Sequence, residues 1–356
     1  IEAARTGLNA IGQQLKQAGI SITIAGTAVT GYGEDLIKAA FGLDEGVVET
    51  VAHFRAAQTF DPNVSFILDI GGQDMKAIFI VEKTISDIQI NEACSSGCGS
   101  FMETLARSLN FTIDEFAQLA CDSREPFDLG TRCTVFMNSK IKQAQREGAL
   151  LPDIAAGLAY AVIKNSLHKV LKLTDVSVLG DHIVVQGGTF RNPAVLRAFE
   201  LLTGREAIRP DMAELMGAYG AAIIARESSH AHPGRVSGFI GFDGLERPLS
   251  IKREMLNCRG CENNCRIARL RFAGGRAYVT GNRCEKCFSN RGRVGRQGQD
   301  LVAAKIDEMR TLAAALTASS RCLRRCAGLA QANRTLNGDL PAERALNSML
   351  CEPGVR

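Results

Sequence analysis

The order of apolar and polar positions in the first part of the chain alternates between helical and strand-like periods. Apolar residues at helical spacing predict helices over residues 1–19, 34–41 and 47–58. Residues 21–26 form a short β-rich run that ends in glycine, and a Gly/Thr loop over 26–33 follows it. The near-continuous apolar run over residues 64–70 predicts a strand buried on both faces, with residues 76–81 alternating as its hairpin partner.

The same kinds of pattern continue to about residue 226. They predict helices over residues 100–109, 112–120, 138–147, 154–171, 192–202 and 212–226. The runs 177–179 and 182–185 are predicted to be strands. Small residues crowd the helix over 212–226, and they would allow its backbone to approach a neighbouring element closely.

The composition changes after this helix. The polar stretch SSHAHP over residues 228–233 predicts a domain boundary. A cysteine-rich segment follows to about residue 290, and an Arg-rich stretch occupies residues 291–356. The pattern of this last stretch predicts no particular fold.

Composition and charge narrow the function. With 46% hydrophobic and 22% charged residues, the 356-residue chain is globular, and disorder throughout is excluded. No apolar run reaches about 18 residues, so no membrane-spanning helix is expected. The net charge of +4 belongs to the last stretch, so a nucleic-acid-binding body is not expected. No export signal follows Ile1, and a cytoplasmic location is expected.

The strongest phosphate-binding signal is the motif DIGGQDMK over residues 69–76. An apolar strand delivers Asp69 at its end, and Gly71 and Gly72 let the backbone bend and approach a ligand closely. Successive N–H groups in such a turn can bind an anion, and the carboxylates of Asp69 and Asp74 could hold Mg²⁺. The alternative is an ordinary Gly-Gly hairpin.

A second glycine pair, Gly187 and Gly188, also follows an apolar strand and precedes a helix that begins near Asn192. Glycine at this place lets a flat adenine ring lie against the backbone. By itself the pair is a weak signal, because strand–Gly–Gly–helix is common in α/β proteins. The order of the two pairs makes it stronger.

A resemblance to a known family is carried by several motifs in a fixed order: DIGGQDMK (69–76), NEACSSGCGSF (91–101), RCTVFMNSKI (132–141), QGGTFRNPAVLRAFE (186–200) and MGAYGAAIIA (216–225). Together with TGYG (30–33) and ETVAHFRAA (49–57), this order resembles the ATP-dependent activators of 2-hydroxyacyl-CoA dehydratases and benzoyl-CoA reductases. The resemblance covers roughly residues 1–226.

The resemblance implies an α/β fold of the actin, sugar-kinase and heat-shock-chaperone type, in which two lobes close over ATP or ADP with Mg²⁺. It assigns catalytic roles to Asp69, Gln73 and Asp74. It assigns nucleotide contacts to Gly71, Gly72, Lys76, Gly187, Gly188 and Asn192. The expected domains are the remainder of the first lobe (1–65), the second lobe (66–228), a cysteine-rich metal module (229–290) and a basic tail (291–356).

One motif of that family is absent from this sequence. The family's first phosphate loop is an Asp-x-Gly-Ser/Thr turn in the first hairpin of lobe one, and no such motif occurs here. The chain is therefore expected to begin after that hairpin, as a fragment of a large multidomain member. Incomplete nucleotide binding is expected to follow.

Cys94 and Cys133 each precede a predicted helix, whose N-terminus favours a thiolate or an anionic cluster. Two such cysteines per chain would supply four across a two-fold homodimer, which is the usual number for a [4Fe–4S] cluster. The resemblance implies this arrangement at the matching positions. Cys98 stands where the family usually has Thr, and it is interpreted as a spectator, a spare ligand or a small buried residue.

Five further cysteines form a second candidate metal site: Cys258, Cys261, Cys265, Cys284 and Cys287. The C-x2-C … C-x2-C spacing is typical of structural Zn²⁺ or of a second iron–sulfur cluster. Five thiols exceed four places, so one is spare. The alternative is a set of unligated cysteines.

The sequence therefore predicts an ATP-driven electron-transfer activator. The resemblance implies a reduced ferredoxin or flavodoxin as electron donor and a CoA-ester dehydratase or reductase as acceptor. Two alternatives stay open: a small-molecule kinase of the same fold, and an inactive metal-binding fragment. His53 is interpreted as a packing residue or a partner of Glu49 rather than a catalytic group.

Overall fold

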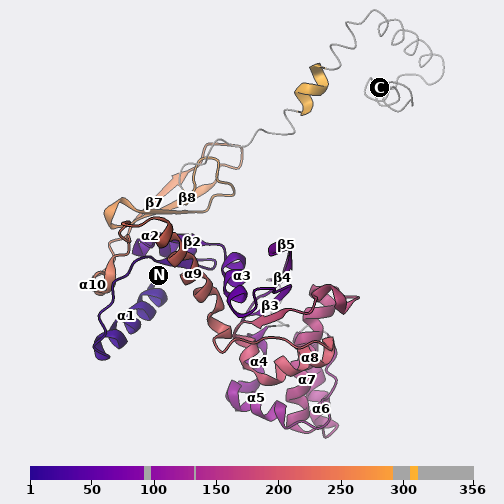
Figure 1. Ribbon diagram of the computed structural model, residues 1–356. Coiled ribbons are helices and arrows are strands. Elements are labelled where there is room, and N and C mark those ends of the chain that lie inside the picture. Colours follow the sequence, from indigo (N-terminus) through magenta and orange to yellow (C-terminus); the bar gives the residue numbers. More distant parts are fainter. Residues whose placement is uncertain (92–97, 132–133, 292–304, 312–356) are drawn as a thin grey trace, which may run out of the picture. The chain divides into compact units, whose positions relative to one another are not determined.

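The computed structural model describes residues 1–91, 98–131, 134–291 and 305–311, without the side chains of residues 134–136 (Figure 1). The chain divides into two compact units, residues 1–290 and residues 291–356. The first unit holds all the labelled strands. Within the described residues, no helix combines the length and the hydropathy needed to span a bilayer.

The unit begins with three helices that the sequence predicts and with a short strand that lies later in the chain than the predicted one. Its elements are α1 (Glu2–Gln17), β1 (Ala28–Thr30), α2 (Glu34–Phe41), β2 (Glu45–Val47) and α3 (Glu49–Phe60). The three predicted helices are confirmed, but the predicted strand over 21–26 is wrong. Pairing begins only at Ala28, which lies parallel to Glu45. A β-rich run forms a strand only where a partner backbone is present, and β2 reaches no further than Ala28.

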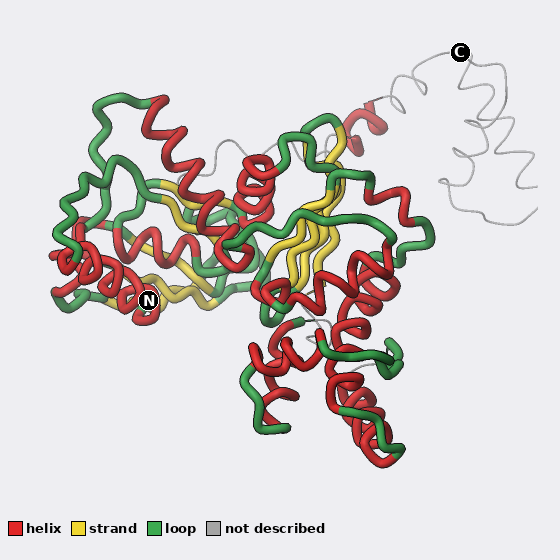
Figure 2. The backbone as a smooth tube through the Cα atoms, turned by 60° about the horizontal axis from the view of Figure 1, so that its bottom comes forward, coloured by secondary structure: helices red, strands yellow, loops and turns green. Residues whose placement is uncertain are grey.

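One sheet of the unit has four strands, in the order β5-β4-β3-β6. Strands are drawn yellow in Figure 2. Its strands are β3 (Phe66–Ile70), β4 (Met75–Val81), β5 (Thr84–Asn91) and β6 (Ile183–Gln186). The β3–β4 hairpin is confirmed, while β5 was not expected. The predicted strand over 177–179 is wrong: Val176–Leu179 is a 3-10 helix, η3, which the Asp175 side chain caps at the N–H of Ser177.

Strand β3 is buried along its whole length because helices cover both faces of the sheet. Phe66 and Leu68 pack into one apolar cluster with the helices that follow β5, whereas Ile67 packs into another with α3 and the helix at Met216. The first set comprises α4 (Gly99–Ser108), α5 (Ile113–Cys121), α6 (Thr134–Arg146), α7 (Leu151–Lys164), the π-helix η2 (Asn165–Val170) and α8 (Pro193–Thr203). The prediction of a strand buried on both faces is confirmed.

The small-residue helix forms as expected and runs past the predicted boundary. After the 3-10 turn η5 (Ala213–Leu215), α9 covers Met216–Ala231. A Cβ at Gly220 would lie 1.8 Å from the carbonyl oxygen of Ala52, so α3 and α9 touch through their backbones there. Only glycine permits this approach.

The cysteine-rich segment folds onto the start of the chain. It contains α10 (Gly241–Glu246) and a three-stranded antiparallel sheet, β7 (Lys252–Asn257), β8 (Arg266–Arg271) and β9 (Ala277–Thr280), with the 3-10 turn η6 (Ala273–Gly275) between the last two strands. Leu245 and Phe272 share one apolar cluster with Phe41 of α2, and Leu8 of α1 packs against it. Residues 1–290 are therefore one compact unit.

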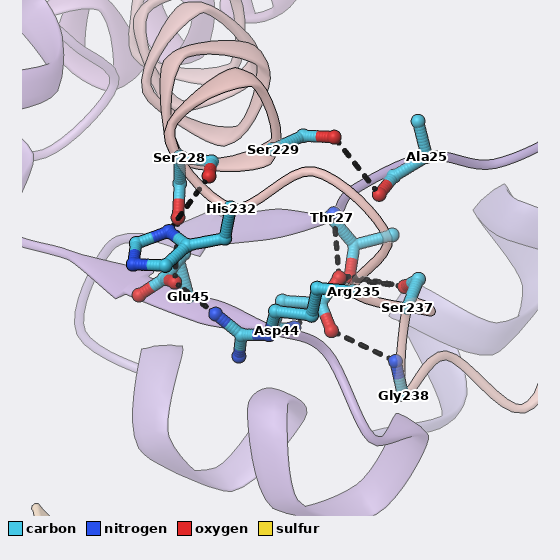
Figure 3. Close-up of polar contacts among 10 residues, drawn as sticks. All are labelled: Ala25, Thr27, Asp44, Glu45, Ser228, Ser229, His232, Arg235, Ser237 and Gly238. Carbon is cyan, nitrogen blue, oxygen red and sulfur yellow. Dashed lines mark hydrogen bonds and ion pairs between the residues drawn. The ribbon is translucent and has the colours of Figure 1, made fainter.

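Asp44 fastens the segment after α9 to the β1–β2 region (Figure 3). Its carboxylate accepts hydrogen bonds from the N–H and hydroxyl of Thr27 at 2.9 and 2.8 Å, from the hydroxyl of Ser237 at 2.6 Å and from the N–H of Gly238 at 2.8 Å. Partial burial opposes ionisation, but these donors outweigh it and lower the pKa of Asp44. The stretch that follows SSHAHP is thus anchored to the first part of the chain.

Acid should loosen this fastening. A lowered folded-state pKa means that the ionised carboxylate stabilises the fold above about pH 4, and that this contribution disappears as the pH falls through the folded value. We expect Asp44→Asn to be less stable at pH 7 and to show a flatter loss of unfolding free energy below about pH 4. Denaturant titrations across this range measure the effect. Asp243→Asn is the control, because the Asp243 side chain is 90% exposed; equal slopes for both variants would contradict the assignment.

Candidate functional site

Two glycine loops meet at one edge of the four-stranded sheet. Strands β3 and β6 are parallel neighbours, and Asp69 is the register partner of Gln186. The loops that leave them therefore start side by side. The carbonyl oxygen of Gly71 accepts hydrogen bonds from the Thr189 hydroxyl at 2.9 Å and from the N–H of Gly99 at 3.0 Å. Two loops that are 118 residues apart are thus joined directly.

Gly187 makes this junction possible. Its φ of +92° lies in the region that side chains disfavour, and a Cβ would fall 2.3 Å from both Asp69 Oδ1 and the carbonyl oxygen of Ile70. No other residue fits between the two strand ends. The 3-10 turn η4 (Gly188–Arg191) and helix α8 then carry the chain away from the sheet.

A cavity of about 500 Å³ opens beside the junction. It is lined by the two loops and by the first turns of α4 and α5: Gly72, Gln73, Gly99, Ser100, Met102, Glu103, Ile113, Asp114, Ala117, Gly188, Thr189, Arg191 and Asn192. This volume lies within the range of small-molecule and cofactor sites. A Cβ at Gly72 or Gly188 would meet nothing within 4 Å, so both glycines leave space on the cavity side.

Asn192 carries a polar group with no partner within the described structure. Its side chain is buried, and its Oδ1 caps α8 by accepting from the N–H of Ala194 at 2.9 Å. The Nδ2 atom is buried without a hydrogen bond. A buried donor that is left unpaired costs about 1–3 kcal/mol, so a ligand that accepts from it in the adjoining cavity would gain that interaction. The cavity thus fits a ligand rich in acceptor atoms.

A network of buried charges lies behind the two loops. The Nε2 atom of His53 on α3 is 3.1 Å from Asp69 Oδ2 and 3.4 Å from Glu49 Oε1, and its Nδ1 is 2.6 Å from Gln186 Nε2. With Gln186 donating to Nδ1, the proton of the ring sits on Nε2 and faces the two carboxylates. The Nζ of Lys76 bonds to Asp74 and, at 3.2 Å, to Glu49.

The surroundings shift the pKa values of two carboxyl groups in the network in opposite directions. Burial raises the pKa of Asp69, although His53 and Lys76 oppose the shift. The hydrogen bond from His53 and the charge of Lys76 lower the pKa of Glu49 to about 2. Burial alone would lower the pKa of Lys76, but Asp74 and Glu49 raise it to about 12. Lys76 and Glu49 are therefore charged at neutral pH, while Asp69 is the carboxyl that takes up a proton most readily.

Three of these groups could share a cation. In the described part of the chain, Glu49, His53 and Asp69 are the one set of three or more metal-type side chains whose donor atoms all lie within 4.8 Å of one another. Their two carboxylates suit Mg²⁺, which prefers oxygen ligands. Asp74, the other carboxylate expected to hold Mg²⁺, pairs with Lys76 instead.

The sequence-predicted site residues divide into five groups. Gly72, Gln73, Gly188 and Asn192 line the cavity. Asp69, Asp74 and Lys76 belong to the charge network, and Gly71 and Gly187 join the loops. Cys94 and Cys133 lie outside the described residues. The five cysteines of residues 258–287 lie at one end of the β7–β9 sheet, and none of them lines the cavity.

The contribution of α5 to the cavity was missed by sequence reasoning. Ile113, Asp114 and Ala117 come from its first two turns. The signal for the start of this helix is visible in the sequence, because Thr112 and Glu115 form a reciprocal capping box. What the sequence lacks is any sign of which helix the loops face. Cys98 is fully buried in the largest apolar cluster, as a small buried residue would be.

Comparison with known proteins places the chain in a family. A model of the BadF/BadG/BcrA/BcrD ATPase family matches residues 2–225. The chain belongs to this ATPase family. The resemblance found from the ordered motifs is confirmed, and the match ends close to the predicted limit at residue 226.

Curated relatives extend this result. The (R)-2-hydroxyglutaryl-CoA dehydratase activating ATPase of Acidaminococcus fermentans is 31% identical over 202 residues, which is 57% of this chain and 75% of that protein. The 2-hydroxyisocaproyl-CoA dehydratase activator of Clostridioides difficile is 30% identical over 55% of this chain and 72% of its own length. One of the subunits of the Thauera aromatica benzoyl-CoA reductase is 29% identical over 44% of this chain and 55% of its own length.

Solved structures show the same α/β fold. Component A of the A. fermentans (R)-2-hydroxyglutaryl-CoA dehydratase has a TM-score of 0.55 and 29% identity, covering 62% of this chain and 83% of that one. The activator of the C. difficile 2-hydroxyisocaproyl-CoA dehydratase, solved with bound ADPNP, has a TM-score of 0.55 and 27% identity over 62% of this chain and 81% of that one.

The charge network should be needed for stability. We expect His53→Ala to lower the free energy of unfolding by about 1–3 kcal/mol, because removing the ring leaves the buried Nε2 of Gln186 and the buried carboxyl of Asp69 without their hydrogen-bond partner. Denaturant unfolding at pH 7 measures it. His182→Ala is the matched control: His182 also pairs with an aspartate, Asp61 at 2.8 Å, but its side chain is 51% exposed. A loss for His53→Ala no larger than that of the control would contradict a network role.

Proposed function

We propose that this protein is an ATP-dependent electron-transfer activator. Its two glycine loops and the cavity beside them form part of the site for ATP or ADP with Mg²⁺, since the family's first phosphate loop is absent from this sequence. Cys94 and Cys133 of two protomers hold one [4Fe–4S] cluster in a cytoplasmic homodimer. It takes electrons from a reduced ferredoxin or flavodoxin and passes one low-potential electron to a dehydratase or reductase of a CoA ester. Similarity to the activating ATPases and to a component of benzoyl-CoA reductase supports the class of partner.

The observation that carries the proposal is the attachment of α4 to the first glycine loop. The first two N–H groups of this helix, those of Gly99 and Ser100, donate to the carbonyl oxygens of Gly71 and Gly72 at 3.0 and 2.8 Å. Cys94 lies five residues before Gly99 in the sequence. A shift of the loop on nucleotide binding therefore reaches the segment that carries the first candidate ligand of the cluster.

The second candidate ligand also precedes a helix in the sequence. Cys133 directly precedes α6, which begins at Thr134. Helix N-termini carry partial positive charge, which favours anionic sulfur ligands. The cluster would supply one-electron chemistry when bound, and its potential would respond to hydrogen bonds and exposure around it. The protein's task is to change those surroundings when the nucleotide changes.

The nucleotide cavity offers suitable groups for phosphate chemistry. Its apolar lining from α4 and α5, Met102, Ile113 and Ala117, suits an adenine ring that lies against the second glycine loop, and the first glycine loop suits the phosphates. Gln73 lines the cavity and is proposed to orient the attacking water. Asp69 and Asp74 are proposed to hold Mg²⁺, directly or through water, which requires them to exchange their present partners His53 and Lys76.

The fold supports a motion between two parts. In the proposed arrangement of the actin and sugar-kinase type, the β3–β6 sheet with its helices forms the second lobe, and the segment before it is the remainder of the first. Helix α9 packs on α3 and so connects the sequence after the second glycine loop back to the first part. Lys76 pairs with both Asp74 and Glu49 of α3, so a cation that claims Asp74 would alter the contact between Lys76 and α3.

Anaerobic purification tests the cluster. We expect a brown dimer with four iron and four sulfide per dimer, and we expect Cys133→Ala to lose this cluster, because each protomer then keeps one ligand where two are needed. Iron and sulfide analysis with native mass measurement provides the readout. Cys121→Ala is the control, since Cys121 is an exposed thiol at the end of α5. A cluster retained in Cys133→Ala would refute the ligand assignment.

Nucleotide binding is tested at Gly72. We expect Gly72→Val to weaken binding of ADPNP at least tenfold, because its side chain would enter space that faces the cavity while meeting no protein atom within 4 Å. Isothermal titration with the same Mg²⁺ concentration compares the dissociation constants. Gly7→Val on α1 adds the same group in open space far from the loops and should bind normally. Equal affinities for both variants would place the nucleotide elsewhere.

A further inference from the structure

The β7–β9 sheet brings two cysteine loops to one end. In the antiparallel register, Asn257 pairs with Arg266 and Ala268 with Thr280. The loop that follows β7 and the segment that follows β9 therefore start at the same end of the sheet. The first carries Cys258 and Cys261, and the second carries Cys284 and Cys287. All four are free thiols.

The thiols of the two loops meet over Gly260. A Cβ at this position would lie 2.3 Å from the Sγ of Cys287 and 3.6 Å from the Sγ of Cys258. Cys258 also forms a side-chain hydrogen bond with Cys287, and Cys284 lies close enough to interact with Cys287 electrostatically. Gly260 thus leaves room for sulfur atoms from both loops in one small volume.

Both loops are held in shape by hydrogen bonds. The N–H of Cys258 donates to the carbonyl oxygen of Cys265 at 2.8 Å and closes the first loop. In the second, the Asn282 side chain donates to the carbonyl oxygens of Cys284 and Phe288 at 3.0 and 3.2 Å. Asn290 then pairs with both backbone groups of Val279 at 2.7 and 2.9 Å. These bonds hold the chain against β9 just after the segment that carries Cys284 and Cys287.

The fifth cysteine differs from the others. Cys265 is only partly exposed and packs against an apolar cluster with Ile267 and Val279. Cys258 belongs to the same cluster, but its thiol reaches Cys287. Cys261, Cys284 and Cys287 are exposed, as expected of residues in loops at one end of a sheet. The structure thus singles out Cys265 as the spare thiol among five.

We propose that Cys258, Cys261, Cys284 and Cys287 bind one structural Zn²⁺ ion, which clamps the two loops of the β7–β9 sheet together, while Cys265 is not a ligand. Four thiolates in two C-x2-C pairs match a tetrahedral, closed zinc site. This site is independent of the nucleotide cavity and of the proposed iron–sulfur cluster.

Two further observations favour a structural ion here. Apart from Cys258, the apolar cluster at this end of the sheet has just two fully buried members in the described structure, Ile267 and Val279, so the loops have little core of their own. Residues 258–290 also carry six arginines and one lysine against two glutamates. That excess of positive charge offsets the two negative charges of a zinc ion with four thiolate ligands.

Metal binding requires the thiols to move closer together. No three of the four thiols satisfy a mutual separation of 4.8 Å in the described structure, whereas sulfur ligands around tetrahedral zinc lie about 3.8 Å apart when each Zn–S bond is about 2.3 Å. Because Cys261, Cys284 and Cys287 are exposed, side-chain rotation can draw them together.

Metal analysis of the full chain tests the proposal. We expect one zinc per chain, with X-ray absorption showing four sulfur neighbours at about 2.3 Å. Serine at Cys258, Cys261, Cys284 or Cys287 should lower zinc occupancy at least tenfold. Cys265→Ser should keep it, and so should Cys133→Ala, which reports on the separate iron site. Loss of zinc in Cys265→Ser equal to that in Cys261→Ser would overturn the ligand set.

Thiol protection in the unaltered protein covers the case in which a variant fails to fold. Brief alkylation followed by peptide mass analysis should show Cys261, Cys284 and Cys287 protected despite their exposure, and a zinc chelator should remove this protection. Cys121, another exposed thiol, should react equally with and without the chelator. Iron and sulfide in place of zinc at these four cysteines, or rapid alkylation of all three before chelation, would refute a zinc site.

Discussion

The site depends on the parallel pairing of β3 with β6. These strands are far apart in the sequence, yet their register sets Asp69 beside Gln186 and makes the two glycine loops leave the sheet together. The contact is so close at Gly187 that a single Cβ would overlap both Asp69 and the backbone of Ile70. The cavity, the cap of α8 and the link to α4 all follow from this one approach of two backbones.

The buried charge network occupies the opposite side of the same junction. Asp69 lies in β3, which leads into the first glycine loop, and Gln186 lies in β6, which leads into the second. His53 of α3 contacts both residues. The imidazole therefore ties the two strand ends to a helix from the first part of the chain. Such a group has little freedom to move unless a carboxylate changes its partner, because each of its ring nitrogens already has one.

Local pattern predicted most elements of the fold, and its failures have physical causes. The apolar run ending at Ile70 and the helix from Glu34 to Phe41 formed as expected, because burial and period agree there. The run over 21–26 did not pair, since β-propensity alone cannot supply a partner strand. The motifs located the glycine loops and the Asp69 region, whereas the facing surface of α5 depends on tertiary packing that no local pattern encodes.

The cluster around Phe41 has a consequence for how the chain can be divided. Leu245 and Phe272, from the cysteine-rich segment, cover Phe41 together with residues of α1. A protein cut after α9, the helix in which the family match ends, would expose this aromatic ring and its aliphatic neighbours to water. Newly bared apolar surface of this kind promotes self-association. The ATPase region and the cysteine-rich segment after it thus share an apolar cluster that neither completes alone.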